Sequence, residues 1–351
     1  MQSEPYKIKE VKKLKILKPY ERWDVLKKTH FNTFHIGSEH ITFDMVAQGM
    51  SGWSHHQKSA YMIGDEAYAG SRNFIRLEKT VREVLHIEGL VPTHNGIGAE
   101  KLLATTMVDK GNLVLHNRGC KSGLVEYKGG ESQDVTRNGE GLDLAKIEEL
   151  LGKKVQKIPY IHIETCPSHW NGQPISFVDL ELLKHLSLTH EVPLVVDISN
   201  IIENSYWIQK EELPNQTIFE IAHTIIGMAD VLLMDASQDA RADIGGFIAS
   251  PHSELFETFR NQVVVFEGLH TYGGMTGRAM EVFAVGLEEM QQEGYVHWYM
   301  EQIDDLYQRL KERGVLVYRG GKGVALDVAD FLPHLSQSIS SRFSYQGGLI
   351  L

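Results

Sequence analysis

Residues 192–198 read Val-Pro-Leu-Val-Val-Asp-Ile, and residues 230–234 read Asp-Val-Leu-Leu-Met. Both runs are short and almost continuously apolar, which is typical of strands buried on both faces of a sheet. Between such runs the apolar residues recur three or four positions apart, as they do from Asn73 onward and over 177–189, and this is helical spacing. Strands that alternate with helices predict an α/β fold with a mostly parallel sheet covered on both faces.

The other elements are expected from the same signals. The further strands are 41–46, 90–93, 113–116, 157–164 and 244–249, and the further helices are 98–107, 254–261, 277–291 and 296–313. Strand 244–249 follows 230–234 so closely that the two are expected to be hairpin-like neighbours. The polar, Gly-rich segment 129–141 is expected to be a surface loop. Ligands of such sheets bind beyond the carboxyl ends of the strands. The expected site segments are 94–98, 116–122, 166–172, 197–200 and 235–239.

The composition is that of a globular protein: 351 residues, 42% hydrophobic and 23% charged, enough for about two domains. The net charge of −11 argues against nucleic acid as the main partner. Residues 1–28 are an exception, with nine Lys or Arg and four Asp or Glu. This arm suits a phosphate group or a membrane surface, or else a solvated or inter-subunit segment, and we favour the second interpretation.

Cysteine content and hydropathy indicate the compartment. Cys120 and Cys166 are the only cysteines, so a disulfide framework is not expected and a reducing environment fits. The sequence has no run of 18 apolar residues, and its lysine-rich start is not followed by the apolar segment of a secretory signal. We expect a cytoplasmic protein with no membrane partner.

An eleven-residue stretch, 64–74, reads Gly-Asp-Glu-Ala-Tyr-Ala-Gly-Ser-Arg-Asn-Phe and resembles the signature of tryptophanase and tyrosine phenol-lyase. Further similar segments follow in order, at 91–96, 172–174, 203–206, 244–247, 263–268 and 272–278. These enzymes form the β-eliminating lyase family. The resemblance implies the type I fold of enzymes dependent on pyridoxal phosphate (PLP), a bound monovalent cation, and cleavage of aromatic amino acids to an arene, pyruvate and ammonia.

The resemblance also implies an organisation and an assembly. Residues 1–40 would be an N-terminal arm and the start of the small domain, residues 41–290 the large α/β domain, and residues 291–351 an incomplete C-terminal small domain. The family forms tetramers built from dimers, so a homo-oligomer, or a hetero-oligomer with a paralogue, is expected.

The position of the family's Schiff-base lysine is altered. After the strand that corresponds to 230–234 the family reads Ser-Gly-Lys-Lys-Asp, and its second lysine binds PLP. This chain reads Asp-Ala-Ser-Gln-Asp over 235–239, so Gln238 stands in place of that lysine and Ser237 in place of the other. An amide nitrogen can neither form an imine nor act as a base.

The phosphate-binding positions are altered as well. Asp235 replaces a serine, Asn95 a glutamine and Ile97 an arginine of the family's turn, in which Gly96 is kept. A carboxylate 4 Å from a phosphate charge costs about 4 kcal/mol at an effective dielectric constant of 20. Lys121 lies in a neighbouring segment and would compensate in part.

Other pocket positions are partly changed and partly kept. Cys120 stands where the family stacks an aromatic ring on the cofactor, Ser168 replaces an asparagine and Asn200 an arginine. The family's substrate-binding arginine lies beyond the position of Leu351. Four positions that the resemblance marks as retained or similar are Asp197 (pyridinium partner), Tyr68 (reaching the neighbouring subunit's site), Glu66 (monovalent cation) and Asp243, which replaces an asparagine beside that cation.

Some residues suggest replacement chemistry. His162, Glu164 and Cys166 alternate along an expected strand, with His169 beyond it, and these are transition-metal ligand types. A buried, hydrogen-bonded histidine and a small buried cysteine are the alternative that we favour. For His55 and His56 we favour surface positions.

Two further pairs have the same ambiguity. Cys120 beside Lys121 is either an activated thiolate or a small residue that fills the space of a lost ring. Asp235 near Asp197 is either an acid–base pair or a structural carboxylate. In both cases we favour the structural alternative.

Three functions remain open. The leading hypothesis is a family homologue that has lost PLP-dependent chemistry and acts as a non-catalytic or regulatory subunit, lending Tyr68 to a competent partner. The alternative is an enzyme with PLP-independent, metal-assisted or acid–base chemistry in the same pocket. The third is a carbon–carbon lyase for an aromatic amino acid that holds PLP without a covalent bond.

Overall fold

The structure, a computed structural model, describes residues 13, 16–42, 52–118, 122–137, 141–167, 172–321 and 323–326. The chain divides into two compact units, one of residues 1–47 with 326–351 and one of residues 48–325. The first unit contains α1 (Pro19–Lys28) and two short 3-10 helices, η1 (Thr33–His35) and η2 (Ser38–His40). The basic segment 1–28 thus includes a helix, α1, that has no buried residue. Residues 43–46 of the expected strand 41–46 lie outside the described residues.

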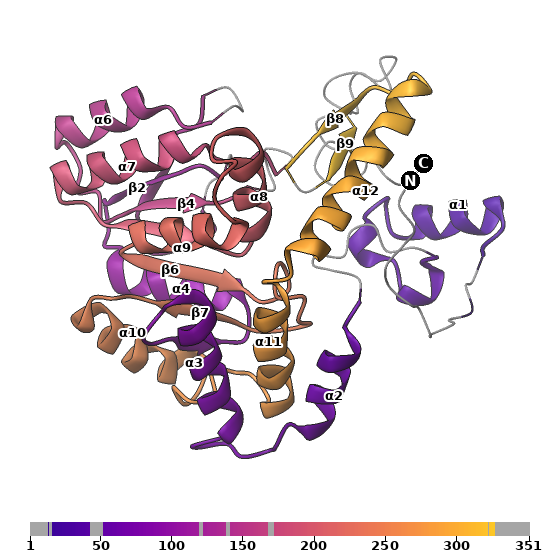
Figure 1. Cartoon of the computed structure of the whole chain (residues 1–351), viewed down its shortest axis with the longest axis horizontal. Helices are drawn as coiled ribbons and strands as arrows, with labels where there is room; N and C mark the ends of the chain where they lie inside the picture. The colour runs from indigo at the N-terminus through magenta and orange to yellow at the C-terminus, as the bar shows by residue number, and fades with distance from the viewer. Residues whose placement is uncertain are drawn as a thin grey trace. The chain divides into compact units, whose positions relative to one another are not determined.

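The second unit is built on a seven-stranded sheet with the order β1-β7-β6-β5-β4-β2-β3 (Figure 1). The strands are β1 (Val91–Thr93), β2 (Leu113–His116), β3 (Glu131–Asp134), β4 (Ile161–Glu164), β5 (Leu194–Asp197), β6 (Val231–Asp235) and β7 (Gly246–Ala249). All neighbours pair in parallel except β7, which is antiparallel to both β6 and β1. The mostly parallel sheet and the hairpin-like β6–β7 pair are confirmed.

Strand β3 corrects one prediction. The segment 129–141 is expected to be a loop, but its residues Glu131–Asp134 pair in parallel with β2. The strand is polar because it lies at the edge of the sheet, where one side of a strand has no neighbour and no apolar run is required. The remaining strands, β8 (Val317–Arg319) and β9 (Val324–Leu326), form a separate two-stranded sheet.

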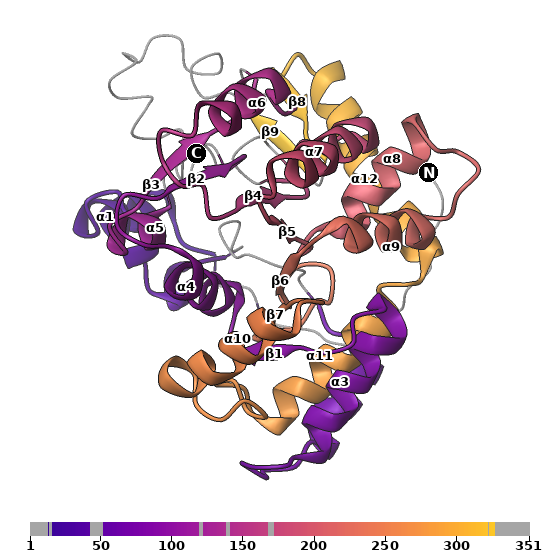
Figure 2. The ribbon, with the colours of Figure 1, turned by 90° about the vertical axis from the view of Figure 1, so that its left-hand side faces the viewer.

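Helices cover both faces of the large sheet (Figure 2). Successive residues of a strand face opposite sides, so Val114, Val195 and Leu233 pack with α4 (Gly96–Met107) and α10 (Ser253–Phe266), while Leu115, Val196 and Leu232 pack in a second core. The second core includes side chains of α3 (Arg72–Leu85), α6 (Leu144–Lys153), α7 (Phe177–His190), α8 (Ile201–Glu211), α9 (Ile218–Met228), α11 (Gly277–Glu289) and α12 (Glu293–Glu312). The last helices are α2 (His55–Ile63) and α5 (Gly123–Tyr127). No helix of the described ranges is long and apolar enough to cross a membrane.

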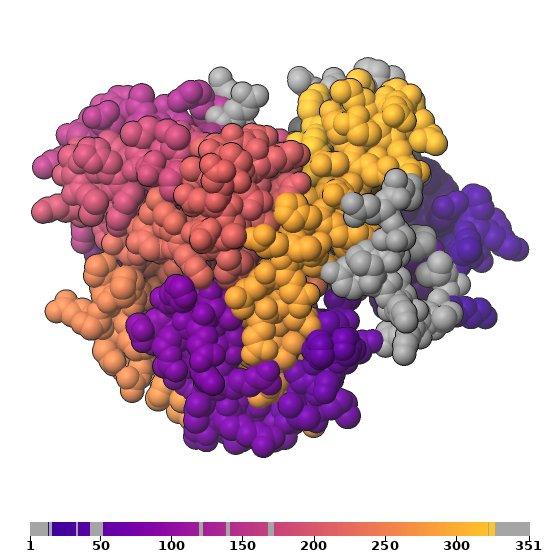
Figure 3. All heavy atoms as spheres, in the orientation of Figure 1, coloured from indigo at the N-terminus to yellow at the C-terminus, as the bar shows by residue number. Residues whose placement is uncertain are grey.

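Helix α11 is the centre of a three-helix contact with α2 and α3, visible at the lower edge of Figure 3. Gly286 of α11 also allows a close approach to the segment after β6, because a Cβ at this position would lie 1.9 Å from the carbonyl oxygen of Ala240. The contact between α11 and Ala240 therefore depends on the absence of a side chain at position 286.

Gly286→Ala should lower the free energy of unfolding by about 3 kcal/mol, because the backbone of Ala240 has to move. Gly227→Ala in α9 is the matched control, since a Cβ there meets nothing within 4 Å, and it should be neutral or stabilising by up to about 1 kcal/mol. Urea unfolding of the three proteins measures both effects. Equal stability of the two variants would contradict the account of this contact.

Candidate functional site

The parallel strands bring polar side chains together at one edge of the sheet. Strands β2, β4, β5 and β6 run in the same direction and end in His116, Glu164, Asp197 and Asp235. These are the strand ends beyond which the site is expected. Helix α4 begins beside this edge at Gly96.

Asp235 lies on the N-terminus of α4. Its Oδ2 accepts the N–H of Gly96 at 2.9 Å, and its Oδ1 accepts the N–H and the hydroxyl of Ser237 at 2.8 and 2.5 Å. The side chain of Asn95 caps the same helix by accepting the N–H of Gly98 at 2.8 Å. A carboxylate is thus held where the helix dipole and free amide groups favour an anion. Ile97, also in this first turn, is 65% exposed and offers no charge.

Ser199 connects Asp197 to the neighbouring strand end. The Asp197 Oδ1 accepts the N–H and the hydroxyl of Ser199 at 2.9 and 2.5 Å, and the Ser199 hydroxyl accepts the N–H of Asp235 at 2.8 Å. The expected Asp197–Asp235 pair is therefore linked through a serine. The carboxylate next to Asp197 is that of Glu164, its register partner on β4.

Arg118, which follows β2, joins two acidic side chains. Its Nη1 donates to Oε1 of Glu100 at 2.6 Å, and its Nε lies 2.5 Å from Oε1 of Glu164. Ser122 also donates to Glu100, at 3.1 Å. The side chains of Arg118, Glu100 and Glu164 are 27%, 11% and 19% exposed, so the ion pairs are mostly removed from water. We call Glu100, Arg118, Glu164 and Asp197 the Arg118 cluster.

The charges of this cluster shift its pKa values. Burial, and after it the charge of Glu164, raises the pKa of Asp197 to about 7. Burial would also raise the pKa of Glu100, but Arg118 outweighs this effect and holds it below its usual value. Burial disfavours the guanidinium ion of Arg118, but Glu164 and Glu100 outweigh burial and raise the pKa of Arg118. Asp197 is therefore partly protonated near neutral pH, and Arg118 stays charged.

Two buried histidines lie next to the cluster. His116 and His162 are register partners on β2 and β4, and they are 2% and 4% exposed. Burial, followed by the charge of Arg118, lowers the pKa of His162 to about 3. The Nε2 atom of each ring has no hydrogen-bond partner within the described residues. His162 is thus a neutral, buried histidine, so the favoured interpretation is confirmed in the burial of the ring. It is wrong in the hydrogen bond to a glutamate, because Glu164 pairs with Arg118 instead.

Of the four candidate metal ligands, the structure describes His162, Glu164 and Cys166 and does not group these three, while His169 lies outside the described residues. Strand β4 ends at Glu164, so the alternation of side chains does not extend to Cys166, whose Sγ lies 3.8 Å from Oδ1 of Asn204. Glu164 instead pairs with Arg118. Across the part of the chain that the structure describes, no three His, Cys, Asp or Glu side chains are grouped as a metal site requires.

Several other predicted residues lie apart from this edge or outside the described residues. The Tyr68 ring packs 4.9 Å from that of Tyr272 and is 56% exposed. Glu66 pairs with Arg278 at 3.0 Å, so an ion pair already engages the expected cation ligand. Asp243, His55 and His56 are exposed. Asn200, by contrast, stays near this edge, because it follows the end of β5 by three residues and precedes α8. The residues outside the described ranges are Cys120, Lys121, Ser168 and His169.

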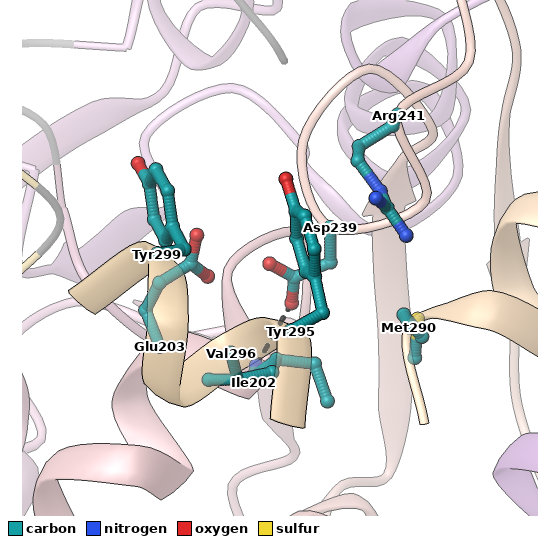
Figure 4. A pocket seen from close by; sticks show the side chains of 8 residues that line it. All are labelled: Ile202, Glu203, Asp239, Arg241, Met290, Tyr295, Val296 and Tyr299. Carbon is teal, nitrogen blue, oxygen red and sulfur yellow. Dashed lines mark hydrogen bonds between the residues drawn. The ribbon is translucent and has the colours of Figure 1, made fainter. Parts of the chain in front are cut away.

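Beyond β6, a small cavity opens beside Asp239 and Arg241 (Figure 4). Its volume is about 30 Å³, which is sufficient for a bound water molecule. Asp239 accepts the N–H of Ile202 at 2.8 Å, and Arg241 stacks over the ring of Tyr295 at 4.2 Å. The full lining is Ile202, Glu203, Asp239, Arg241, Met290, Tyr295, Val296 and Tyr299. Sequence reasoning did not identify this cavity, because its residues come from four separate segments.

Solved structures define the class of this fold. A putative aromatic amino acid beta-eliminating lyase/threonine aldolase from Exiguobacterium matches with a TM-score of 0.62 and 18% identity, over 85% of this chain and 84% of that one. Serine palmitoyltransferase from Sphingomonas wittichii matches with a TM-score of 0.56 and 16% identity, over 76% and 65%. The chain has the type I fold of PLP-dependent enzymes.

Sequence comparison gives the family. The model of the family described as "Beta-eliminating lyase" matches residues 42–336. Tyrosine phenol-lyase of Clostridium tetani is 34% identical over 95% of this chain and 77% of its own length. Tryptophanase of Salinibacter ruber is 30% identical over 99% and 79%. The chain belongs to the β-eliminating lyase family.

The described residues of the pocket do not fit PLP held through a Schiff base. The carboxylate of Asp235 takes up the Gly96 amide at the anion-binding end of α4, and a phosphate would meet this charge. Gln238, three residues beyond the end of β6, has an amide side chain, which cannot form an imine.

Proposed function

We propose that this chain is a β-eliminating lyase homologue that has lost PLP-dependent chemistry and acts as a non-catalytic subunit. The observation that carries the proposal is the hydrogen bond from the Gly96 N–H to the Asp235 carboxylate. A phosphate and a carboxylate compete for this helix terminus, and the carboxylate belongs to the chain. Gln238 adds an independent obstacle, because no imine forms at an amide.

The size of the penalty supports the loss of cofactor binding. A phosphate charge 4 Å from Asp235 is repelled by about 4 kcal/mol at an effective dielectric constant of 20, which weakens binding about a thousandfold. Binding is weakened further because PLP cannot form a covalent imine with the amide of Gln238.

Exposed apolar side chains support a role in an assembly. Tyr68, Ile97 and Val265 are 56%, 65% and 72% exposed. We propose that such positions contact another subunit, either a second copy or a full-length paralogue. Tyr68 would then contribute its side chain to the active site of that subunit. We also propose a cytoplasmic location, in agreement with the low cysteine content of two residues, Cys120 and Cys166.

An activity assay tests the loss of catalysis. Purified protein with excess PLP is incubated with L-tyrosine or L-tryptophan, and pyruvate is measured through coupled NADH oxidation. We expect no pyruvate above that of a blank without protein, whereas the Clostridium tetani relative serves as the positive control. Pyruvate formation that scales with the concentration of this chain would contradict the proposal.

A mixing experiment tests the role as a subunit. A full-length tyrosine phenol-lyase whose own signature tyrosine is replaced by phenylalanine should gain activity when it is co-expressed with this chain. Tyr68→Phe is the matched control and should give no gain. The subunit role would be rejected if, in size-exclusion chromatography, this chain eluted as a monomer and did not co-elute with the lyase.

A further inference from the structure

We propose that the pocket is completed by the chain's own charges: Asp235 acts as the anion at the N-terminus of α4, and Arg118 acts as the cation beside Glu164 and Asp197. This inference rests on the proposed loss of PLP chemistry and deepens it.

The first half concerns Asp235. A helix N-terminus attracts an anion through its dipole and its free N–H groups, and α4 receives one from β6, 139 residues away in sequence. Both hydrogen bonds from Ser237 fix the orientation of the carboxylate. The approach is close, since a Cβ at Gly96 would lie 2.8 Å from the Cβ of Asp235. The Asp235 carboxylate therefore occupies the position at the N-terminus of α4 where an anion would bind.

The second half concerns Arg118. Three carboxyl groups, those of Glu100, Glu164 and Asp197, converge at the strand ends from different elements. A mostly buried group of acids is unstable without a counter-charge. Arg118 contacts two of them directly and acts on the third electrostatically. The cation that this group needs is thus part of the chain.

Among the described residues, the N-terminus of α4 has Asp235 as its anion and the acids at the strand ends have Arg118 as their cation, so these two features need no ligand to satisfy them. Removal of either side chain should therefore create a vacancy that a small ion of matching charge can fill.

Asp235→Ser tests the anion half. Inorganic phosphate, compared with sodium chloride at equal ionic strength, should raise the Tm of this variant by several degrees and leave that of the wild type unchanged. Asp143→Ser is the matched control, because Asp143 also caps a helix, α6, by accepting the N–H of Lys146 at 3.1 Å. An equal rise in the wild type or in the Asp143 variant would overturn this half.

Arg118→Ala tests the cation half. Millimolar methylguanidinium should restore part of its lost Tm and should not raise the Tm of the wild type. Arg260→Ala is the control, since Arg260 forms an exposed ion pair with Glu257. Unchanged stability of Arg118→Ala, or equal rescue of the control, would overturn this half.

If Arg118→Ala does not fold, two milder variants decide the matter. Arg118→Lys keeps the charge and Arg118→Met keeps much of the volume, so a counter-ion role predicts that the lysine variant is the more stable. Greater stability of Arg118→Met would overturn the proposal. These readouts need no PLP and no turnover, so they can fail while the proposed function stands, and the reverse also holds.

Discussion

Asp235→Ser combined with Gln238→Lys should restore covalent binding of PLP, whereas Gln238→Lys alone should bind it about a thousandfold more weakly. The lysine supplies an amine able to form an imine. The serine removes the carboxylate that holds the Gly96 N–H and with it a repulsion of about 4 kcal/mol on the phosphate. Absorbance titration with PLP gives the apparent dissociation constants of both variants.

The comparison separates the two defects of the pocket. Asp235→Ser alone is the control that opens the phosphate position without providing an amine, and it should give no borohydride-stable adduct at position 238. If Gln238→Lys alone bound PLP as tightly as the double variant, Asp235 would not be a barrier and the account of the α4 terminus would be wrong.

Asp197→Asn should change the pH dependence of stability. Burial, followed by the charge of Glu164, raises the pKa of Asp197 to about 7 in the folded protein, against about 3.9 in an unfolded chain. Between these values the folded state keeps a proton that the unfolded state has lost, so stability falls as the pH rises. The wild type should lose up to about 4 kcal/mol relative to Asp197→Asn between pH 4 and pH 7.

Urea unfolding at several pH values measures this difference. Asp109→Asn serves as the control, because Asp109 is exposed and its replacement should leave the shape of the pH profile unchanged. Parallel profiles for the wild type and Asp197→Asn would show that Asp197 is ionised throughout and would contradict its assigned environment.

The fold could be predicted because its signals are local. The apolar run at 113–116 matches β2, and the pattern at 230–234 locates β6 to within one residue. Helix α4 begins two residues earlier than predicted, at Gly96, because the Asn95 side chain caps it. Strand β3 was not predicted, since a polar edge strand lacks the apolar alternation on which strand prediction depends.

The site could be predicted only in part. The strand-end segments that contain Asp197 and Asp235 were predicted correctly, because the carboxyl ends of parallel strands meet at one edge. The role of Arg118 was missed, since its partners Glu100 and Glu164 lie 18 and 46 residues away and no local pattern joins them. The less favoured metal site at His162, Glu164, Cys166 and His169 finds no support among its three described residues, because β4 ends before Cys166 and an ion pair engages Glu164.

The most direct test of the central claim is covalent capture of PLP by the wild-type protein. The protein is mixed with PLP, its visible spectrum is recorded, and borohydride reduction is followed by intact-mass and peptide mass spectrometry. The account predicts no Schiff-base band and no stoichiometric adduct. A stoichiometric adduct at a single lysine, with Lys121 as the first to inspect, would contradict it and would show that the Schiff base has moved within a working PLP site.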